Sequence, residues 1–281
     1  MVSRELQRQA LFESLDRRIL CLDGAMGTML QQAGLTAADF GGPALEGCNE
    51  VLVRTRPDVV LGVHRAYLAA GADVIETDTF GGAPIVLAEY GLEADAHELN
   101  RRAAELARQA ANEFFTPERP RFVAGSMGPT TKSISTTGGV TFAELREAYY
   151  VQAKALAEGG ADILLIETCL DTRNVKAALL AVQQVMRELA SKIPVIVSGT
   201  IERSGTMLGG QAADAFYVSV AHADLLAIGL NCATGPEFMT DHLRTLHEIA
   251  STRISCYPNA GLPNEEGAYL ETPESLARQL Q

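Results

Sequence analysis

The chain contains two near copies of one local pattern, "AYLAAGADVIETDTFGG" at residues 66–82 and "ALAEGGADILLIETCLDT" at residues 155–172. In each copy a helix-like segment runs into a glycine, and Ala-Asp, a short apolar run and Glu-Thr follow. Gly71 and Gly160 suit the left-handed residue that ends many helices. The apolar runs are too short and too apolar for surface helices, so they predict strands buried on both faces, as parallel sheets require.

The same pattern, applied along the whole chain, predicts seven strands separated by helices. The strands are expected at 19–22, 73–76, 122–125, 162–167, 194–198, 225–230 and 254–257. The helices are expected at 58–70, 94–113, 141–158, 173–190, 211–222 and 236–250. Such alternation indicates a parallel α/β fold.

The spacing of the predicted strands favours a (β/α)8 TIM-type barrel, because each unit takes roughly 35–40 residues. The turn after the first strand, Gly24-Ala25-Met26-Gly27, is not the GxGxxG fingerprint of a dinucleotide-binding sheet. No linker rich in Pro, Gly or Ser divides the sequence, so a single domain is expected over residues 1–281.

Composition excludes several classes of protein. The net charge is −12 and no cluster of Lys and Arg occurs, which argues against nucleic-acid binding. No apolar run reaches the roughly 18 residues of a membrane span. The charged N-terminal segment does not resemble a signal peptide, and a cytoplasmic protein is expected. The acidity favours solubility, with an acidic docking surface for a partner as the alternative.

The five cysteines are too few and too widely spaced for a disulfide framework. They are Cys21, Cys48, Cys169, Cys232 and Cys256. Cys232 follows the apolar run 227–230, where the strand should already have ended, so it suits a metal thiolate or a nucleophile. The alternative is a buried core thiol. Cys21 and Cys48 are interpreted as structural, and Cys169 and Cys256 as less favoured candidates near the strand ends.

Polar residues gather where the predicted strands end, which is where β/α barrels carry their chemistry. They include Asp23, Glu76-Thr77-Asp78, Ser126, Glu167-Thr168-Cys169, Ser198, Asn231-Cys232 and Asn259. Basic residues are absent from these strand ends. The resulting acidic rim suits a ligand that carries an ammonium group, a metal cation, or both, and does not suit a bare phosphate. The alternatives are that Asp23 only caps a turn and that Glu76 only pairs with an arginine.

Eight motifs at these positions resemble the homocysteine S-methyltransferase family. In order they are "RILCLDGAMGTML", "GADVIETDTF", "VAGSMGPT", "GADILLIETCLDT", "VSGTI", "GGQ", "GLNCATGP" and "PNAGLPN". They are most similar to the homocysteine-binding domains of cobalamin-dependent methionine synthases. The resemblance runs from about residue 18 to residue 281, and eight motifs in one order are highly specific.

The resemblance implies a zinc thiolate chemistry. Family members hold Zn²⁺ through three cysteines, of which Cys232 matches one and an adjacent Cys-Cys pair after the eighth strand supplies two. Such an open zinc site takes the sulfur of homocysteine as its fourth ligand and presents it as a thiolate. The thiolate then accepts a methyl group, which in methionine synthase comes from methylcobalamin, recharged from methyltetrahydrofolate. The implied partners are therefore homocysteine and the cobalamin-binding and folate-binding domains of a parent protein.

The resemblance also implies roles for individual residues. Asp23 and Glu167 would bind the ammonium group of the substrate. The backbone around Gly24, Ala25, Met26 and Gly27, together with Ser126, would meet its carboxylate. Glu76, Thr79 and Asn231 would lie close to the metal.

The sequence departs from the family pattern in one respect, because it has no Cys-Cys pair. Only a PNAGLPN loop and a helix start at 272–281, with Thr272 as its N-cap, follow the seventh predicted strand. The barrel is therefore expected to stop before its eighth strand.

Three alternatives to a cobalamin-dependent methyltransferase stay open. They are a stand-alone methyltransferase that uses betaine or S-methylmethionine, an incomplete fragment that only binds a partner or substrate, and an unrelated barrel lyase. The lyase is disfavoured because the rim lacks a lysine and phosphate-binding basic residues.

Overall fold

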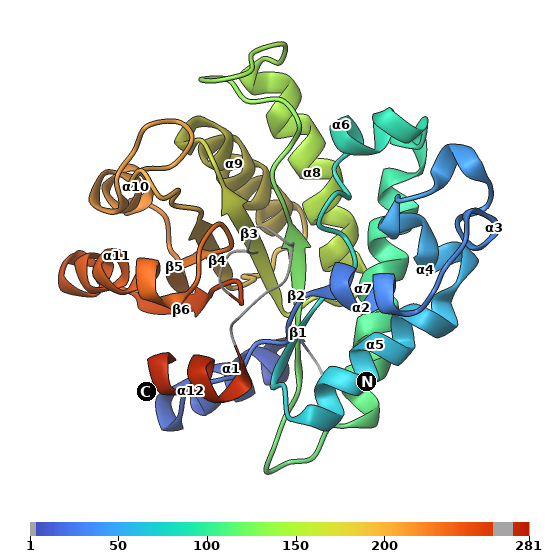
Figure 1. Cartoon of the computed structure of the whole chain (residues 1–281), viewed down its shortest axis with the longest axis horizontal. Coiled ribbons are helices and arrows are strands. Elements are labelled where there is room, and N and C mark those ends of the chain that lie inside the picture. Colours follow the sequence, from blue (N-terminus) through green and yellow to red (C-terminus); the bar gives the residue numbers. More distant parts are fainter. Residues whose placement is uncertain (1–3, 261–271, 281) are drawn as a thin grey trace.

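The computed structural model describes residues 4–260 and 272–280, and within them six parallel strands form one curled sheet (Figure 1). The strands are β1 (Val74–Glu76), β2 (Phe122–Met127), β3 (Ile163–Cys169), β4 (Val195–Gly199), β5 (Ala227–Asn231) and β6 (Arg253–Tyr257). They pair in chain order, β1 to β6, and every pair is parallel. All the C-terminal strand ends therefore lie along one edge of the sheet.

Helices connect the strands and cover the outside of the sheet (Figure 1). The α-helices are α1 (Arg4–Arg17), α2 (Met26–Gln32), α3 (Ala37–Phe40), α4 (Leu52–Thr55), α5 (Pro57–Ala70), α6 (Pro84–Leu87), α7 (Ala96–Glu113), α8 (Phe142–Glu158), α9 (Thr172–Glu188), α10 (Ala213–Val220), α11 (Pro236–Ile249) and α12 (Pro273–Leu280). Short 3-10 turns are η1 (Pro43–Leu45), η2 (Asn49–Val51), η3 (Ala88–Tyr90) and η4 (Glu93–Asp95).

The fold confirms a TIM-like α/β architecture that lacks its last strands. No pairing joins β6 to β1 in the described part of the chain, so the sheet is a half-barrel and not a closed barrel. The helix ends predicted at Gly71 and Gly160 are confirmed, because both glycines are left-handed, with φ of 112° and 102°. Thr272 caps α12, since its Oγ1 accepts the backbone N–H of Ser275 at 3.2 Å.

The predicted strand at 19–22 is the one strand that does not form. A single bridge joins Leu22 to Val74, and the carbonyl of Cys21 accepts the backbone N–H of Asp73 and Val74. This segment has β1 on one side and no described strand on the other, and Ile19 is 89% exposed. An extended segment with one neighbour and little burial gains too little to form a full ladder.

Strands β2 to β5 are buried on both faces, β6 is half-exposed, and successive residues alternate between two clusters. One cluster lies inside the curl and includes Val74, Phe122, Ile163 and Ile196, closed from α1 by Leu11. The other lies between sheet and helices, and its strand members include Ile75, Val123, Leu164, Ile166, Val197, Ile228, Leu230 and, partly buried, Cys256. This period of two decides which side chain at each strand end faces the inside of the half-barrel.

Replacing Gly229 in β5 with alanine is predicted to destabilise the fold. A Cβ there would lie 2.1 Å from the carbonyl oxygen of Ser255 in β6, which is backbone and cannot move away cheaply. We expect Gly229→Ala to lower the free energy of unfolding by about 1–3 kcal/mol or more in urea denaturation. Gly62→Ala is the control, because a Cβ there meets open space within α5, where alanine is the better helix former. Equal stability of the two variants would contradict this account of the β5–β6 contact.

Candidate functional site

A polar layer lies inside the half-barrel at the C-terminal strand ends. The alternation along the strands places Glu76, Ser126, Glu167, Ser198, Asn231 and Tyr257 in it, one from each strand. Below this layer the interior is apolar. The layer therefore brings together side chains from all six strands at the edge where a parallel sheet of this kind binds ligands.

Glu167 is the most enclosed carboxyl group of this layer, at 4% exposure. Ser126 Oγ donates to its Oε1, while Asn231 Nδ2 and Tyr257 Oη each lie 3.4 Å from its Oε2. Burial raises the pKa of Glu167 to about 7, although the hydrogen bonds from Ser126 and Tyr257 act in the opposite direction. The group can therefore change its charge near neutral pH, which makes it sensitive to a cation placed beside it.

Asp23 and Glu76 lie beside Glu167 and share its electrostatic environment. Both carboxylate oxygens of Asp23 accept the backbone N–H of Glu76, at 3.0 and 3.1 Å. The pKa of Asp23 is raised well above its usual range, first by burial and further by the nearby charge of Glu167. The pKa of Glu76 is raised likewise by burial and then by Glu167, Asp23 and Cys232. Three carboxyl groups crowded in this way favour a positively charged ligand.

Cys232 stands directly after β5 in a left-handed conformation, with φ of 59°. Ala233 and Thr168, the latter at a bulge in β3, are also left-handed, with φ of 55° and 52°. Such conformations cost about 1–3 kcal/mol each for residues other than glycine, and they concentrate at functional sites. The half-buried thiol lies 3.2 Å from Asn231 Nδ2 and 3.7 Å from Thr168 Oγ1, and burial raises its pKa.

Asn231 connects the carboxyl group and the thiol. It is fully buried, and its Oδ1 accepts Ser198 Oγ at 2.7 Å and the backbone N–H of Thr168 at 3.0 Å. Its Nδ2 donates to Thr168 Oγ1 at 2.8 Å and also lies within reach of Cys232 Sγ at 3.2 Å and Glu167 Oε2 at 3.4 Å. Because the thiol and the carboxyl group both contact this one nitrogen, the fold fixes their separation.

The remaining predicted residues lie around this cluster. Thr79 is buried and donates to the carbonyl oxygen of Ser126 at 2.7 Å, so it supports the end of β2. Gly24 and Ala25 are exposed, directly before α2, which begins at Met26 and contains Gly27. Tyr67 Oη donates to the carbonyl of Ala25 at 3.3 Å and pins this segment to α5.

The other cysteines do not join Cys232. Cys169 is buried on the helix side of β3, where its thiol donates to the carbonyl of Ile166, and Cys256 also packs on the helix side. Cys48 is buried beside Glu50, and Cys21 is exposed. Among residues 4–260 and 272–280, no three His, Cys, Asp or Glu side chains are arranged to hold a metal ion. These residues therefore supply one thiolate and not a complete zinc site.

Two features of the site were not predicted from the sequence: the place of Tyr257 in the polar layer, and the burial beside Glu50 of Asp78, which the sequence had placed only at a strand end. Tyr257 belongs to the polar layer, although the alternation from Cys256 could have placed it there. Asp78 is buried at 5% exposure with no partner for Oδ2 among the described residues, and Glu50, whose Oε1 accepts the Gly81 N–H at 2.6 Å, lies nearby. Burial and then Glu50 raise the pKa of Asp78 well above its usual range.

Asp78→Asn is expected to flatten the pH dependence of stability. Because the pKa of Asp78 is raised in the folded chain, the unfolded chain binds fewer protons above about pH 4, so the free energy of unfolding falls as the pH rises. Asparagine does not titrate, so the substitution removes this contribution to the pH dependence of the free energy of unfolding. Urea denaturation at pH 5 and pH 8 measures it, with the exposed Asp241→Asn as control. A pH dependence as steep as that of the original chain would contradict the assignment.

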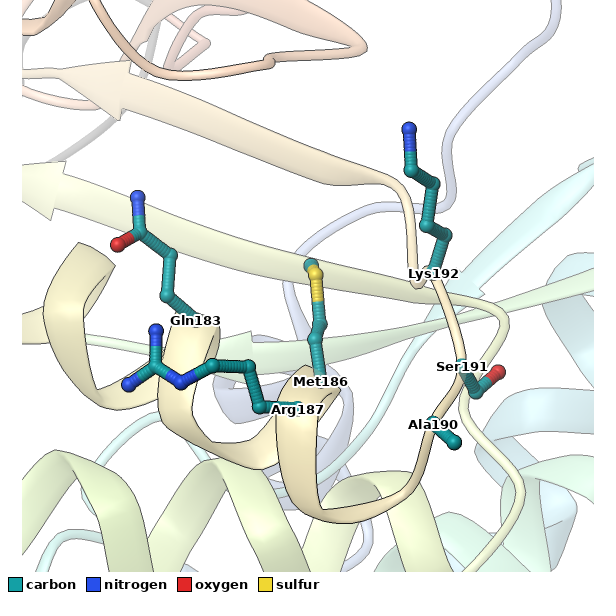
Figure 2. Close-up of a pocket in the computed structure, with 6 residues that line it drawn as sticks. All are labelled: Gln183, Met186, Arg187, Ala190, Ser191 and Lys192. Carbon is teal, nitrogen blue, oxygen red and sulfur yellow. The ribbon is translucent and has the colours of Figure 1, made fainter.

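In the described part of the chain, one cavity adjoins the site and a second hollow lies away from it. A cavity of about 190 Å³ lies under the loop 129–137 and has Glu167, Cys169 and Asp171 in its wall. A shallower hollow of about 360 Å³ is lined by Gln183, Met186, Arg187, Ala190, Ser191 and Lys192 (Figure 2). It lies between the end of α9 and the start of β4, at the opposite end of the strands from the polar layer.

No helix in the described residues is long and apolar enough to cross a bilayer.

Fold and site together define a β/α half-barrel with an acidic, thiol-bearing rim. Comparisons with known proteins agree with this fold and identify the family. The family model for homocysteine S-methyltransferase matches residues 20–281. The chain belongs to this family.

Solved structures of the homocysteine methyltransferase MmuM from Escherichia coli are similar to this chain. The oxidized form is 26% identical, with a TM-score of 0.75 over 90% of this chain and 86% of that one. The metallated form is 25% identical, with a TM-score of 0.76 over 90% of this chain and 88% of that one. The apo form is 25% identical, with a TM-score of 0.68 over 87% and 83%.

Proposed function

We propose that the polar layer binds homocysteine and that this chain takes part in methyl transfer to its sulfur. The observation that carries the proposal is that a cluster of carboxyl groups, which favours a cation, lies at a fixed distance from the thiol of Cys232. The methyltransferase family membership supports it.

The ammonium group is placed at Glu167 and Asp23. A charged donor on a carboxylate makes a stronger hydrogen bond than a neutral one, and here it would also relieve the repulsion among three carboxyl groups. Glu76 holds Asp23 through its backbone N–H, and a cation bound here would favour the ionised form of its own carboxyl group, whose pKa is raised by burial. The exposed backbone of Gly24 to Gly27 is the proposed partner of the carboxylate, with Ser126 fixing Glu167.

The sulfur is placed beside Cys232, whose thiol contacts the same Asn231 Nδ2 as Glu167 does. In a zinc enzyme of this family Cys232 would be one ligand, and the metallated form of MmuM supports a metal in such proteins. The metal would lower the pKa of the substrate thiol and present it as a thiolate. Since the described residues supply one ligand, their proposed part is to bind and orient homocysteine.

The proposed methyl donor is methylcobalamin, carried by a cobalamin-binding domain and recharged through a folate-binding domain. A small donor such as betaine or S-methylmethionine is the second candidate, and the resemblance to MmuM over 90% of the chain favours it as much. The third candidate is a chain that binds homocysteine and transfers nothing.

Methionine formation from homocysteine tests these candidates, measured by mass spectrometry with zinc and one donor at a time. Product with methylcobalamin supports the first candidate, and product with betaine or S-methylmethionine alone supports the second. Binding of homocysteine without product from any donor supports the third. The absence of both binding and product would contradict the proposal.

A further inference from the structure

Tyr257 occupies the last position of β6 and faces the inside of the half-barrel. It is in register with Asn231 across the β5–β6 pair. Its neighbour Cys256 packs against the cluster between sheet and helices, so alternation turns Tyr257 the other way. Among the described residues, β6 pairs with β5 only, and most of its side chains are half-exposed. A large aromatic side chain at this place is therefore directed into the polar layer by the backbone.

The phenol of Tyr257 completes the hydrogen bonds that hold the carboxyl group of Glu167. Oε1 accepts from Ser126 of β2, whereas Oε2 accepts from Asn231 of β5 and Tyr257 of β6. Ser126 and Asn231 are themselves anchored, through Thr77 and through Ser198. Donors on both oxygens, from three different strands, define the plane of the carboxyl group.

The orientation of Glu167 matters because an ammonium group makes directional bonds. A carboxyl group that can rotate must be ordered when the ligand arrives, and ordering a side chain of this kind costs about 0.5–1.5 kcal/mol. A donor that is already in place removes part of this cost.

We propose that Tyr257 is a positioning residue, which orients Glu167 for the ammonium group of the substrate through its phenolic hydroxyl. This inference rests on the proposed function. The inference extends that function by naming a side chain that acts on the substrate through another residue. It predicts an effect confined to ligands that carry an amino group.

The test compares two ligands on three forms of the full chain by calorimetry. L-homocysteine carries the amino group, whereas 4-sulfanylbutanoate keeps the thiol and the carboxylate and lacks it. Tyr257→Phe removes only the hydroxyl and is expected to weaken homocysteine binding about 3–10-fold, the range of one hydrogen bond, with the analogue unchanged. Tyr217→Phe is the control, because its hydroxyl meets Ser251, outside the polar layer.

Two results would overturn the inference. One is unchanged homocysteine affinity in Tyr257→Phe, and the other is an equal loss for both ligands, which would show a general structural effect. Ser126→Ala provides a second variant, expected to show the same selective loss through the other oxygen of Glu167. If the original chain binds no homocysteine, the proposed function fails first, and that outcome is recognised before any variant is compared.

Discussion

Glu167→Gln is expected to weaken homocysteine binding by at least about tenfold. The substitution keeps the shape of the side chain and removes the negative charge, so a charge-assisted hydrogen bond to the ammonium group becomes a neutral one, which is roughly half as strong. The Gln amide would also turn an N–H₂ group toward Ser126, Asn231 or Tyr257, which now donate to the carboxyl group. Isothermal titration at pH 8, where a group with a pKa near 7 is mostly ionised, shows the largest difference.

Glu188→Gln is the matched control for this prediction. Glu188 also accepts hydrogen bonds, from Tyr150 and Lys154, but it lies at the end of α9 on the outer surface. Its substitution should leave homocysteine affinity unchanged. If Glu167→Gln bound homocysteine as tightly as the original chain, with its melting temperature preserved, the carboxyl cluster would not be the ammonium site.

The second large effect concerns zinc. The 281-residue chain is expected to hold far less than one zinc ion per chain after dialysis, because Cys232 is the one thiol that the described structure brings to the polar layer. Loss of partners that merely support metal ligands costs about 10–100-fold in affinity, and a site short of two thiolates should lose more. Cys232→Ser should remove the zinc that remains, whereas Cys21→Ser, at an exposed position outside the layer, should not.

Metal analysis and competition with a chromophoric chelator measure this zinc. One tightly held zinc per chain that survives in Cys232→Ser would show that other residues form the site. One tightly held zinc that is lost in Cys232→Ser would show that further ligands join Cys232.

The fold was predictable because its signal is local and repeated. Short, wholly apolar runs after Gly71 and Gly160 specify buried parallel strands, and six of the seven predicted strands form. The strand at 19–22 fails because pairing depends on a second neighbour, which is a tertiary property that a run of apolar residues does not contain.

The sequence indicated which strand-end residues would lie together, apart from Tyr257, but it did not indicate their contacts. Parallel topology alone places Asp23, Glu167 and Cys232 at one edge. The role of Asn231 as the link between carboxyl group and thiol depends on a bulge in β3 and on left-handed residues at 168 and 232, which no local pattern indicates. No local pattern indicates that Glu50 lies near Asp78, since Glu50 belongs to η2, 28 residues earlier in the chain, and is brought here by its hydrogen bond from the Gly81 N–H.

The most direct test of the central claim compares homocysteine with 4-sulfanylbutanoate on the unaltered chain. The account predicts saturable binding of homocysteine at one site per chain, and affinity for the amino-free analogue that is at least about tenfold lower, because the ammonium contact with the carboxyl cluster is lost. Equal affinity for the two ligands, or no binding of homocysteine, would contradict it.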